Sequence, residues 1–266
     1  MPPVHGPARF PANLGAPAIR FVDESGSMLL FLLSALRRIF SPRQFSKIVT
    51  QIYVIGAQSF FLIALIGIFT GMVLGLQGYY TLVQFGSEGM LGAAVALTLI
   101  RELGPVLTAL MVAGRAGSAM TAEIGVMRIT DQIDALEVMD INPISYLVSP
   151  RIVASIIAFP ILTAVFDVIG IIGGYLTGVV MLGINSGVYF YRIEHSTTMT
   201  DVSGGFAKSV AFAILVTLAC CYKGYMAHTR TDGAGPVAVG NATTSAVVLS
   251  CVFVLMADYV LTSVLL

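Results

Sequence analysis

The stretch that decides the fold is IVTQIYVIGAQSFFLIALIGIFTGMVLGLQGYYTLVQFGS, residues 48–87, which contains no charged residue. A helix needs about 20 mostly apolar residues to cross the hydrocarbon core of a bilayer. A transmembrane β-strand would instead alternate apolar and polar residues over about ten positions. Because the apolar run is continuous, it predicts a membrane-spanning helix at about 52–78.

The composition of the whole chain agrees with this stretch. Of 266 residues, 57% are hydrophobic and only 11% are charged, against about 25% charged residues in an ordinary soluble domain. A water-soluble globule is excluded, and so is disorder for the bulk of the chain. The 14 basic and 14 acidic residues cancel, so net charge does not indicate a nucleic-acid partner. We therefore expect an all-α polytopic membrane protein with one membrane domain, residues 48–266.

Four further apolar stretches predict spans at about 89–114, 152–181, 203–224 and 237–265. The stretch 152–191 is ambiguous, because it could also form a tight hairpin around the turn Gly183–Gly187. One span followed by an external loop is the preferred interpretation. A hairpin would give six spans instead of five.

The N-terminal region has a different character. Residues 1–24 are rich in Pro, Gly and Ala and predict a disordered tail. Residues 25–47 hold a short apolar run that is followed by Arg37, Arg38, Arg43 and Lys47. A signal peptide would carry its basic residues before the run, so we expect a helix that lies on the membrane surface.

The distribution of Lys and Arg predicts the orientation. With five spans, one side of the membrane receives Arg9, Arg20, Arg37, Arg38, Arg43, Lys47, Arg115, Arg128, Arg151, Lys223 and Arg230, and the other side receives only Arg192. Short cytoplasmic loops carry the excess of basic residues. The N-terminus is therefore expected in the cytoplasm, although this bias does not by itself exclude six spans.

Glycines recur at every fourth residue in two predicted spans. They are Gly67, Gly71 and Gly75 in the first span and Gly170, Gly174 and Gly178 in the third. This spacing places them on one helical face, where a missing side chain lets another backbone approach. Packing within one chain is one interpretation, and a homodimer contact through the first span is the other.

Several charged residues interrupt the apolar stretches. Arg101 and Glu102 lie near the middle of the second span, and each is costly there without a partner. Adjacent residues point about 100° apart on a helix, so these two cannot simply neutralise each other. The candidate partners inside spans are Asp167, Lys208 and Asp258. They predict a buried ion-pair network, and Pro105 removes the helical hydrogen bond to the Arg101 carbonyl.

The segment TAEIGVMRITDQIDALEVM, residues 121–139, is amphipathic and predicts a cytoplasmic helix. Val126, Ile129, Ile133 and Leu136 have the spacing of one helical face. Such a helix between two spans can insert into a groove on a soluble partner and transmit its motion. The alternative is a helix resting on the membrane surface, but acidic residues on its other faces favour this less.

Motifs of self-sufficient enzymes are absent from the sequence. It has no GxxxxGK[ST] phosphate loop and no HExxH motif. Cys220, Cys221 and Cys251 lie in apolar runs without metal-ligand spacing, and we expect them to be small core residues. A non-catalytic protein without a metal or cofactor of its own is predicted.

Three segments carry a resemblance to a known family. They are GIFTGMVLGLQGY (67–79), LIRELGPVLTALMVAGRAGSAMTAEIGVMRITDQIDALEVM (99–139) and NPISYLVSPR (142–151). The chain resembles the MlaE/YrbE family of permease subunits of phospholipid-transporting ABC systems, from about residue 28 to its C-terminus. One departure is Ser245, where some relatives carry arginine.

The resemblance implies a homodimer in the inner membrane of a Gram-negative bacterium, with a membrane-lying N-terminal helix and five spans. The implied partners are a cytoplasmic ABC ATPase that binds ATP and Mg, a small STAS-like cytoplasmic subunit and a periplasmic hexamer of MCE domains. Residues 121–139 would be the coupling helix that docks on the ATPase, with Glu123 and Met127 beside its apolar face. Arg101, Glu102, Lys208 and Asp258 match intramembrane charges of the family.

On this basis we expect the dimer to enclose an outward-facing cavity for phospholipid, lined by the first, second and fifth spans. Val73, Leu74 and Leu76 would contact acyl chains. The head group would meet Gln77, Tyr79 and Glu88 at the periplasmic rim. Two other function classes stay open: an ion-coupled secondary transporter using Glu102 and Asp258, and a structural anchor for a periplasmic lipid-transfer ring.

Overall fold

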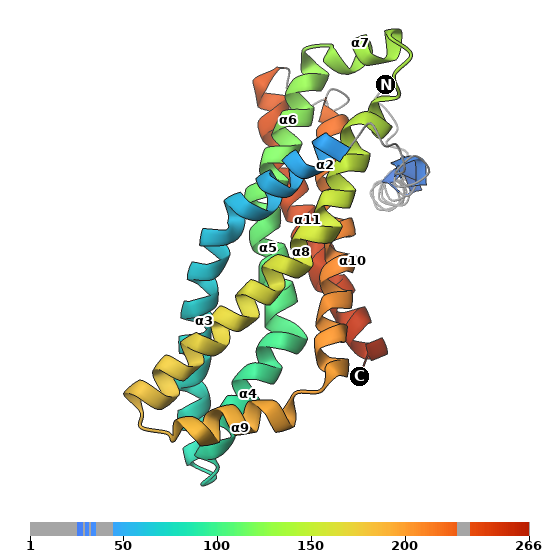
Figure 1. Cartoon of the computed structure of the whole chain (residues 1–266). Helices are drawn as coiled ribbons and strands as arrows, with labels where there is room; N and C mark the ends of the chain where they lie inside the picture. Colours follow the sequence, from blue (N-terminus) through green and yellow to red (C-terminus); the bar gives the residue numbers. More distant parts are fainter. Residues whose placement is uncertain (1–25, 29, 32, 36–44, 228–234, 266) are drawn as a thin grey trace, which may run out of the picture.

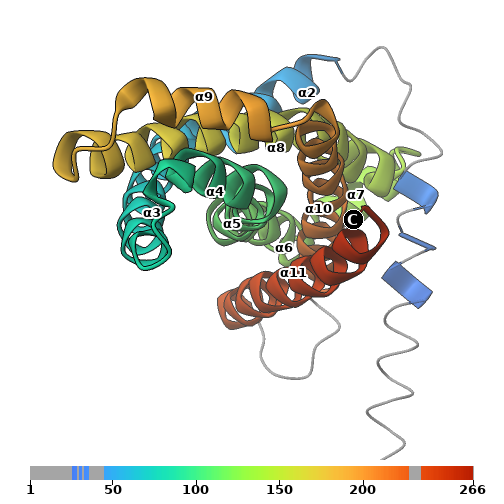
Figure 2. The ribbon, with the colours of Figure 1, turned by 90° about the horizontal axis from the view of Figure 1, so that it is seen from below.

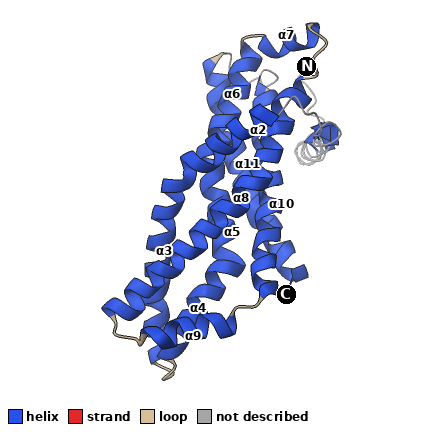
Figure 3. Cartoon of the chain, viewed as in Figure 1, coloured by secondary structure: helices blue, strands red, loops and turns tan. Residues whose placement is uncertain are grey.

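The computed structural model describes residues 26–28, 30–31, 33–35, 45–227 and 235–265. In these ranges the regular structure is helical throughout, as Figures 1 and 3 show. The predicted tail at 1–24 lies outside the described residues. The predicted surface helix at 25–47 lies partly outside them; its described residues 26–28, 30–31 and 33–35 are helical, and residues 45–47 belong to the next helix.

Within the described ranges, five helical segments are long and apolar enough to cross a membrane: Phe45–Val83, Glu88–Ile129, Pro143–Met181, Met199–Tyr225 and Pro236–Leu265. The predicted number of spans is therefore confirmed. The third segment runs without interruption from Pro143 to Met181, so the hairpin alternative is wrong. All five are longer than predicted, because their ends include polar turns that hydropathy alone does not assign to a helix.

Short π-helical pieces divide the first two segments, and another ends the third. The first consists of α2 (Phe45–Ile52), η2 (Tyr53–Ala57) and α3 (Gln58–Val83). The second consists of η3 (Glu88–Met90), a 3₁₀ turn, then α4 (Leu91–Thr98), η4 (Leu99–Leu103), α5 (Gly104–Val112), η5 (Ala113–Gly117) and α6 (Ser118–Ile129). The third consists of α8 (Pro143–Tyr175) and η6 (Leu176–Met181). Such π-turns interrupt the regular hydrogen-bond ladder and are often found at functional sites.

The glycine stripes join α3 to α8 within one chain. A Cβ atom added to Gly71 would lie 1.8 Å from the carbonyl oxygen of Gly170, and one added to Gly75 would lie 3.1 Å from that of Gly174. The Cβ of Gly67 would meet the Phe166 carbonyl oxygen at 3.1 Å. The backbones can approach this closely only because the side chains are absent. These glycines therefore serve packing within the chain, and a homodimer contact through the first span stays a prediction.

The segment after the third span is a helix and not the plain external loop that the sequence suggested. Asn185 accepts hydrogen bonds from the backbone N–H groups of Gly187 and Val188 and so begins α9 (Ser186–Ser196). Figure 2 shows α9 crossing the end of the bundle beside α4 and α8. Tyr189 anchors it: its hydroxyl donates to the Ile171 carbonyl at 3.1 Å, and burial raises the pKa of this tyrosine to about 12.

The other end of the bundle holds α7 (Gln132–Val138), the C-terminal end of α10 (Met199–Tyr225) and the N-terminal end of α11 (Pro236–Leu265). The predicted single helix 121–139 is wrong in detail, because the backbone breaks after Ile129 and Asp131 takes a left-handed conformation with φ of 56°. This break turns α7 back so that Ile133 and Leu136 are buried in the protein's own core. The same core includes Phe31, whose ring meets the Tyr222 ring edge-on.

Candidate functional site

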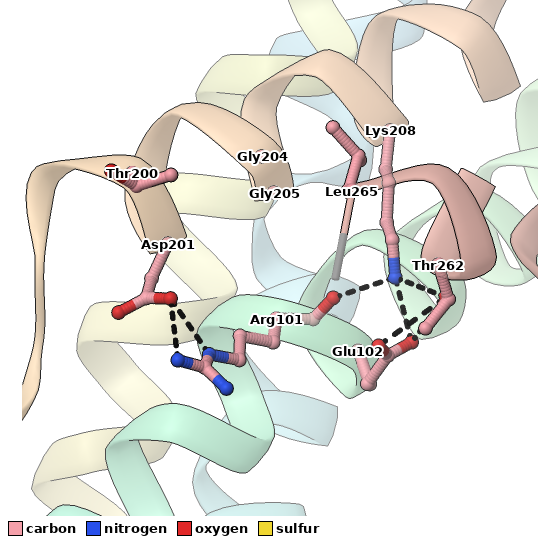
Figure 4. A pocket seen from close by; sticks show the side chains of 9 residues that line it. All are labelled: Arg101, Glu102, Thr200, Asp201, Gly204, Gly205, Lys208, Thr262 and Leu265. Atoms are coloured by element: carbon pink, nitrogen blue, oxygen red, sulfur yellow. Dashed lines mark hydrogen bonds and ion pairs between the residues drawn. The ribbon is translucent and has the colours of Figure 1, made fainter.

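A cluster of charged side chains joins the second, fourth and fifth spans around Lys208 of α10. Its ammonium donates to Glu102 Oε2 at 2.7 Å, to Thr262 Oγ1 at 2.8 Å and to the carbonyl oxygen of Arg101 at 2.9 Å (Figure 4). These three acceptors use all three donors of the ammonium group. The Lys208 side chain is only 4% exposed, so the three spans share one buried positive charge.

Asp258 of α11 completes the surroundings of Lys208. Its Oδ1 atom lies 3.2 Å from Nζ, which is an ion-pair distance, but it accepts no hydrogen bond from any described residue. Thr262, one turn further along α11, lies 3.3 Å from both carboxylate oxygens of Glu102. Lys208 therefore has two carboxylates from different spans beside it and a hydrogen bond with only one.

Two residues make this contact possible: Pro105, which has no backbone N–H group, and Gly205, which has no side chain. Pro105 has no N–H group, so it cannot donate to the Arg101 carbonyl as a helical residue would, and Lys208 donates to that carbonyl instead. A Cβ atom added to Gly205 would lie 2.4 Å from the Ile100 carbonyl oxygen. Glycine at 205 therefore lets α10 lie directly against the π-helical segment η4.

Arg101 points away from Glu102 and pairs with Asp201, at the start of α10. The guanidinium approaches Asp201 Oδ1 at 2.8 Å from Nε and at 2.7 Å from Nη2. Asp201 also forms a reciprocal capping box with Thr198, whose backbone N–H donates to its other oxygen at 2.9 Å. Asp201 was not among the predicted charges, because hydropathy placed the start of this span at 203. The pattern Thr198-x-x-Asp201 is the capping signal that could have found it.

Asp167 does not join the cluster, contrary to expectation. It lies on the other side of the second span, where its Oδ1 atom would be 1.9 Å from a Cβ added to Gly104. This oxygen is buried and accepts no hydrogen bond from the residues that the structure describes. It lines a separate cavity of about 240 Å³ together with Thr163 and Phe206.

The space at the Lys208 cluster is small. Figure 4 shows the cavity that Arg101, Glu102, Asp201, Lys208 and Thr262 line with their neighbours. Its volume of about 50 Å³ suits a few water molecules, each of which needs roughly 10–15 Å³ of such space. A phospholipid does not fit in it. In one chain the cluster therefore joins helices and is not itself a lipid pocket.

The residues predicted to contact lipid lie on α3 and at the start of the second span. Val73, Leu76, Gln77 and Glu88 are exposed on the surface of the chain, whereas Leu74 and Tyr79 pack against the main core. A cavity of about 490 Å³ with an apolar wall lies elsewhere, between α3, α8 and α10. Leu74 and Tyr79 are thus half-buried in the single chain, and the contact of all these residues with lipid stays a prediction.

The residues predicted to couple to an ATPase divide into two groups. Ile133 and Leu136 are buried within the chain, and Met127 and Ile129 are partly buried. Val126 is exposed, and Glu123 is exposed but pairs with Arg151 at 2.7 Å. The exposed apolar side chains that sequence reasoning missed here are Val138 and Met139, 88% and 59% exposed. They were missed because the prediction assumed one continuous helix over 121–139 and assigned its docking face to other residues.

Arg115 makes a further set of contacts between helices. Its guanidinium donates to Ser59 Oγ at 2.9 Å, to Gln58 Oε1 at 2.8 Å and to the Val54 carbonyl at 3.2 Å. This residue of η5 thereby joins the second span to η2 and the start of α3.

Comparison with known proteins agrees with this architecture. The family described as Permease MlaE matches residues 48–264. A Haemophilus influenzae protein named intermembrane phospholipid transport system permease protein MlaE is 42% identical over 96% of this chain and 97% of its own length. A probable ABC transporter permease protein of Rickettsia felis is 41% identical over 94% of this chain and 95% of its own. The Arabidopsis thaliana chloroplast protein trigalactosyldiacylglycerol 1 is 35% identical over 78% of this chain and 58% of its own. The chain belongs to the MlaE family of permeases.

Proposed function

We propose that this chain is the membrane subunit of an ATP-driven ABC transporter that moves phospholipids between the inner and outer membranes. The relative from Haemophilus influenzae is named for intermembrane phospholipid transport, and the one from Rickettsia felis for an ABC permease. The observation that carries the proposal is the buried Lys208, held between Glu102 and Asp258 of two other spans. A buried charge with two alternative carboxylates can bind either one as the spans move.

In the proposed transport cycle, a movement of the spans would transfer the hydrogen bond of Lys208 from Glu102 to Asp258. In the described state Lys208 donates to Glu102 and only approaches Asp258. A small shift of α11 along α10 would reverse this preference without leaving the ammonium unpaired. Because an unpaired buried charge is costly, the spans would move between two paired arrangements and would not rest between them.

Lipid would occupy a cavity that forms between two copies of the chain. Large apolar side chains of α3 and α11 are exposed, among them Phe69, Val73, Val252 and Met256. Figure 2 shows these two helices flanking the second span on one side of the bundle. In the proposed dimer Val73 and Leu76 contact acyl chains, while Gln77, Tyr79 and Glu88 lie nearer the head group.

Energy would come from a separate cytoplasmic ATPase that binds ATP and Mg. The last turn of α6 and the segment that connects it to α8 would dock on it through Val126, Val138 and Met139. In this proposal the N-terminus and α7 would lie in the cytoplasm and α9 in the periplasm, which is the orientation that the excess of basic residues predicts. A small STAS-like subunit on the cytoplasmic side and a periplasmic MCE hexamer would complete the inner-membrane complex.

The variant Glu102→Gln tests the role of the charge cluster. It keeps a hydrogen-bond acceptor for Lys208 but removes the negative charge, so the complex should assemble while ATP-dependent phospholipid transport falls at least about tenfold. Glu194→Gln, which changes an exposed carboxylate on α9, is the matched control and should transport normally. Normal transport by Glu102→Gln at normal protein level would contradict the proposal.

A further inference from the structure

A polar cavity of about 280 Å³ lies between α2, α6 and α8. Figure 1 shows α2 and α6 toward the end of the bundle that holds α7. Its polar wall includes Ser46, Lys47, Thr50, Gln51, Glu123 and Arg151. None of these residues belongs to the Lys208 cluster. The cavity is therefore a separate site from the Lys208 cluster.

Arg151 forms the buried wall of this cavity. The residue is only 3% exposed. Its Nη2 atom donates to Glu123 at 2.7 Å and its Nη1 atom to the Leu147 carbonyl at 2.6 Å. The buried Nε atom has no hydrogen-bond partner among the described residues. Because a buried donor without an acceptor is unfavourable, the guanidinium has capacity for a further anionic ligand.

Lys47 supplies a second positive charge from the opposite wall. Its Nζ atom lies 2.8 Å from the centre of the Tyr146 ring, a cation–π contact that holds it beside the cavity. In the described part of the chain no carboxylate pairs with Lys47. With Lys47 and Arg151 against Glu123, the cavity carries one net positive charge, which matches the single negative charge of a phosphodiester.

The helix α2 places this cavity where lipid head groups would lie. Phe45, Val49 and Tyr53 are exposed at a spacing of four residues, while the hydroxyl and amide groups of this helix line the cavity. A helix with one exposed apolar face and one polar face is typical of a membrane–water interface. Both α2 and the start of α8 continue directly into candidate spans.

We propose that this cavity binds a phosphate group, held by Lys47 and Arg151 and by the hydroxyl groups of Ser46 and Thr50. A phospholipid of the adjacent membrane leaflet carries such a group, and so does free phosphate. Because the site shares no residue with the Lys208 cluster, its existence does not depend on the proposed transport cycle. Binding can therefore be tested without an ATPase.

The test uses the absence of tryptophan from the sequence. Tyr146→Trp provides the only tryptophan and keeps an aromatic ring under Lys47. The full chain, in a maltoside detergent without phosphate, is titrated with dihexanoyl phosphatidylglycerol, with inorganic phosphate and with dihexanoylglycerol, while tryptophan fluorescence is recorded. We expect saturable binding of the phosphatidylglycerol and none of the dihexanoylglycerol. An affinity for the lipid above that for inorganic phosphate assigns the site to a lipid, and equal affinities assign it to free phosphate.

Lys47→Gln in this background should weaken binding by at least about fivefold, the effect of losing one hydrogen bond to a charged group. Lys47 is chosen because it is less buried than Arg151, so its replacement leaves the core intact. Arg192→Gln, which removes an exposed charge on α9, should change the affinity by less than about twofold, as expected for an exposed charge far from the ligand. The absence of saturable binding by either phosphate compound would overturn the proposal. Equal affinities of the Lys47→Gln and Arg192→Gln proteins would overturn it as well.

Discussion

The contact between α3 and α8 and the cluster around Lys208 join helices by opposite means. At the first, glycines bring two backbones together, and a Cβ at Gly71 would meet a carbonyl oxygen at 1.8 Å. At the second, a lysine reaches acceptors on two neighbouring spans. The glycine contact has one tight arrangement, whereas the charged cluster has more than one possible pairing. We therefore expect the α3–α8 contact to stay fixed, whereas the spans that meet at Lys208 can move between alternative ion pairs.

The largest effect is expected at the charged cluster. Lys208→Met leaves Glu102 and Asp258 without their shared partner and should destabilise the protein by about 3–5 kcal/mol, because breaking a buried ion pair leaves an uncompensated charge. Thermal unfolding of the detergent-solubilised protein measures the loss.

A matched variant then separates charge from packing. Adding Glu102→Gln and Asp258→Asn to Lys208→Met should recover more than half of the lost stability, since no buried charge remains unpaired. A triple variant no more stable than Lys208→Met alone would show that Lys208 acts chiefly by its packing.

The glycine contact should respond next most strongly. Gly71→Leu forces α3 away from α8 and should cost about 3 kcal/mol, at the upper end of what overpacking usually costs. Unlike the stability lost in Lys208→Met, the stability lost in Gly71→Leu should not be recovered by removing charges elsewhere. Gly240→Ala is the control, because a Cβ there meets nothing within 4 Å and should raise helix stability by up to about 1 kcal/mol. Equal unfolding temperatures for the two variants would contradict the close contact.

The smallest effect is expected at Asp201, at the edge of the charged cluster. Asp201→Ala removes the partner of Arg101 and half of the capping box of α10, and should cost about 1–2 kcal/mol, as loss of a helix cap does. Asp201→Asn keeps an acceptor for the Thr198 N–H group and should lose less. If Ala and Asn at this position unfold at the same temperature, the cap contributes little and the ion pair dominates.

The sequence predicts those features of the fold that depend on the residues of a single segment. Continuous apolar runs predicted the five spans, and the spacing of Gly67, Gly71 and Gly75 predicted a close helix contact. The partner of each charge was harder to predict, because it depends on how separate spans face one another. Glu102 and Lys208 were expected to belong together, but Asp167 was wrongly included and Asp201 was omitted.

The remaining differences have local backbone causes. A left-handed residue at Asp131 breaks the helix expected over 121–139 and buries Ile133. Periodicity alone cannot reveal such a break, since the apolar spacing continues on both sides of it. The helix α9 was likewise hidden, because its mixed polar and aromatic sequence resembles a loop.

The most direct test of the central claim is reconstitution of the chain in proteoliposomes with a fluorescent phospholipid, with and without its ATPase and ATP. The account predicts phospholipid movement only when the ATPase hydrolyses ATP, and loss of this movement in the Glu102→Gln protein. Movement driven by a proton gradient in liposomes that contain this chain alone would contradict it and would identify an ion-coupled secondary transporter.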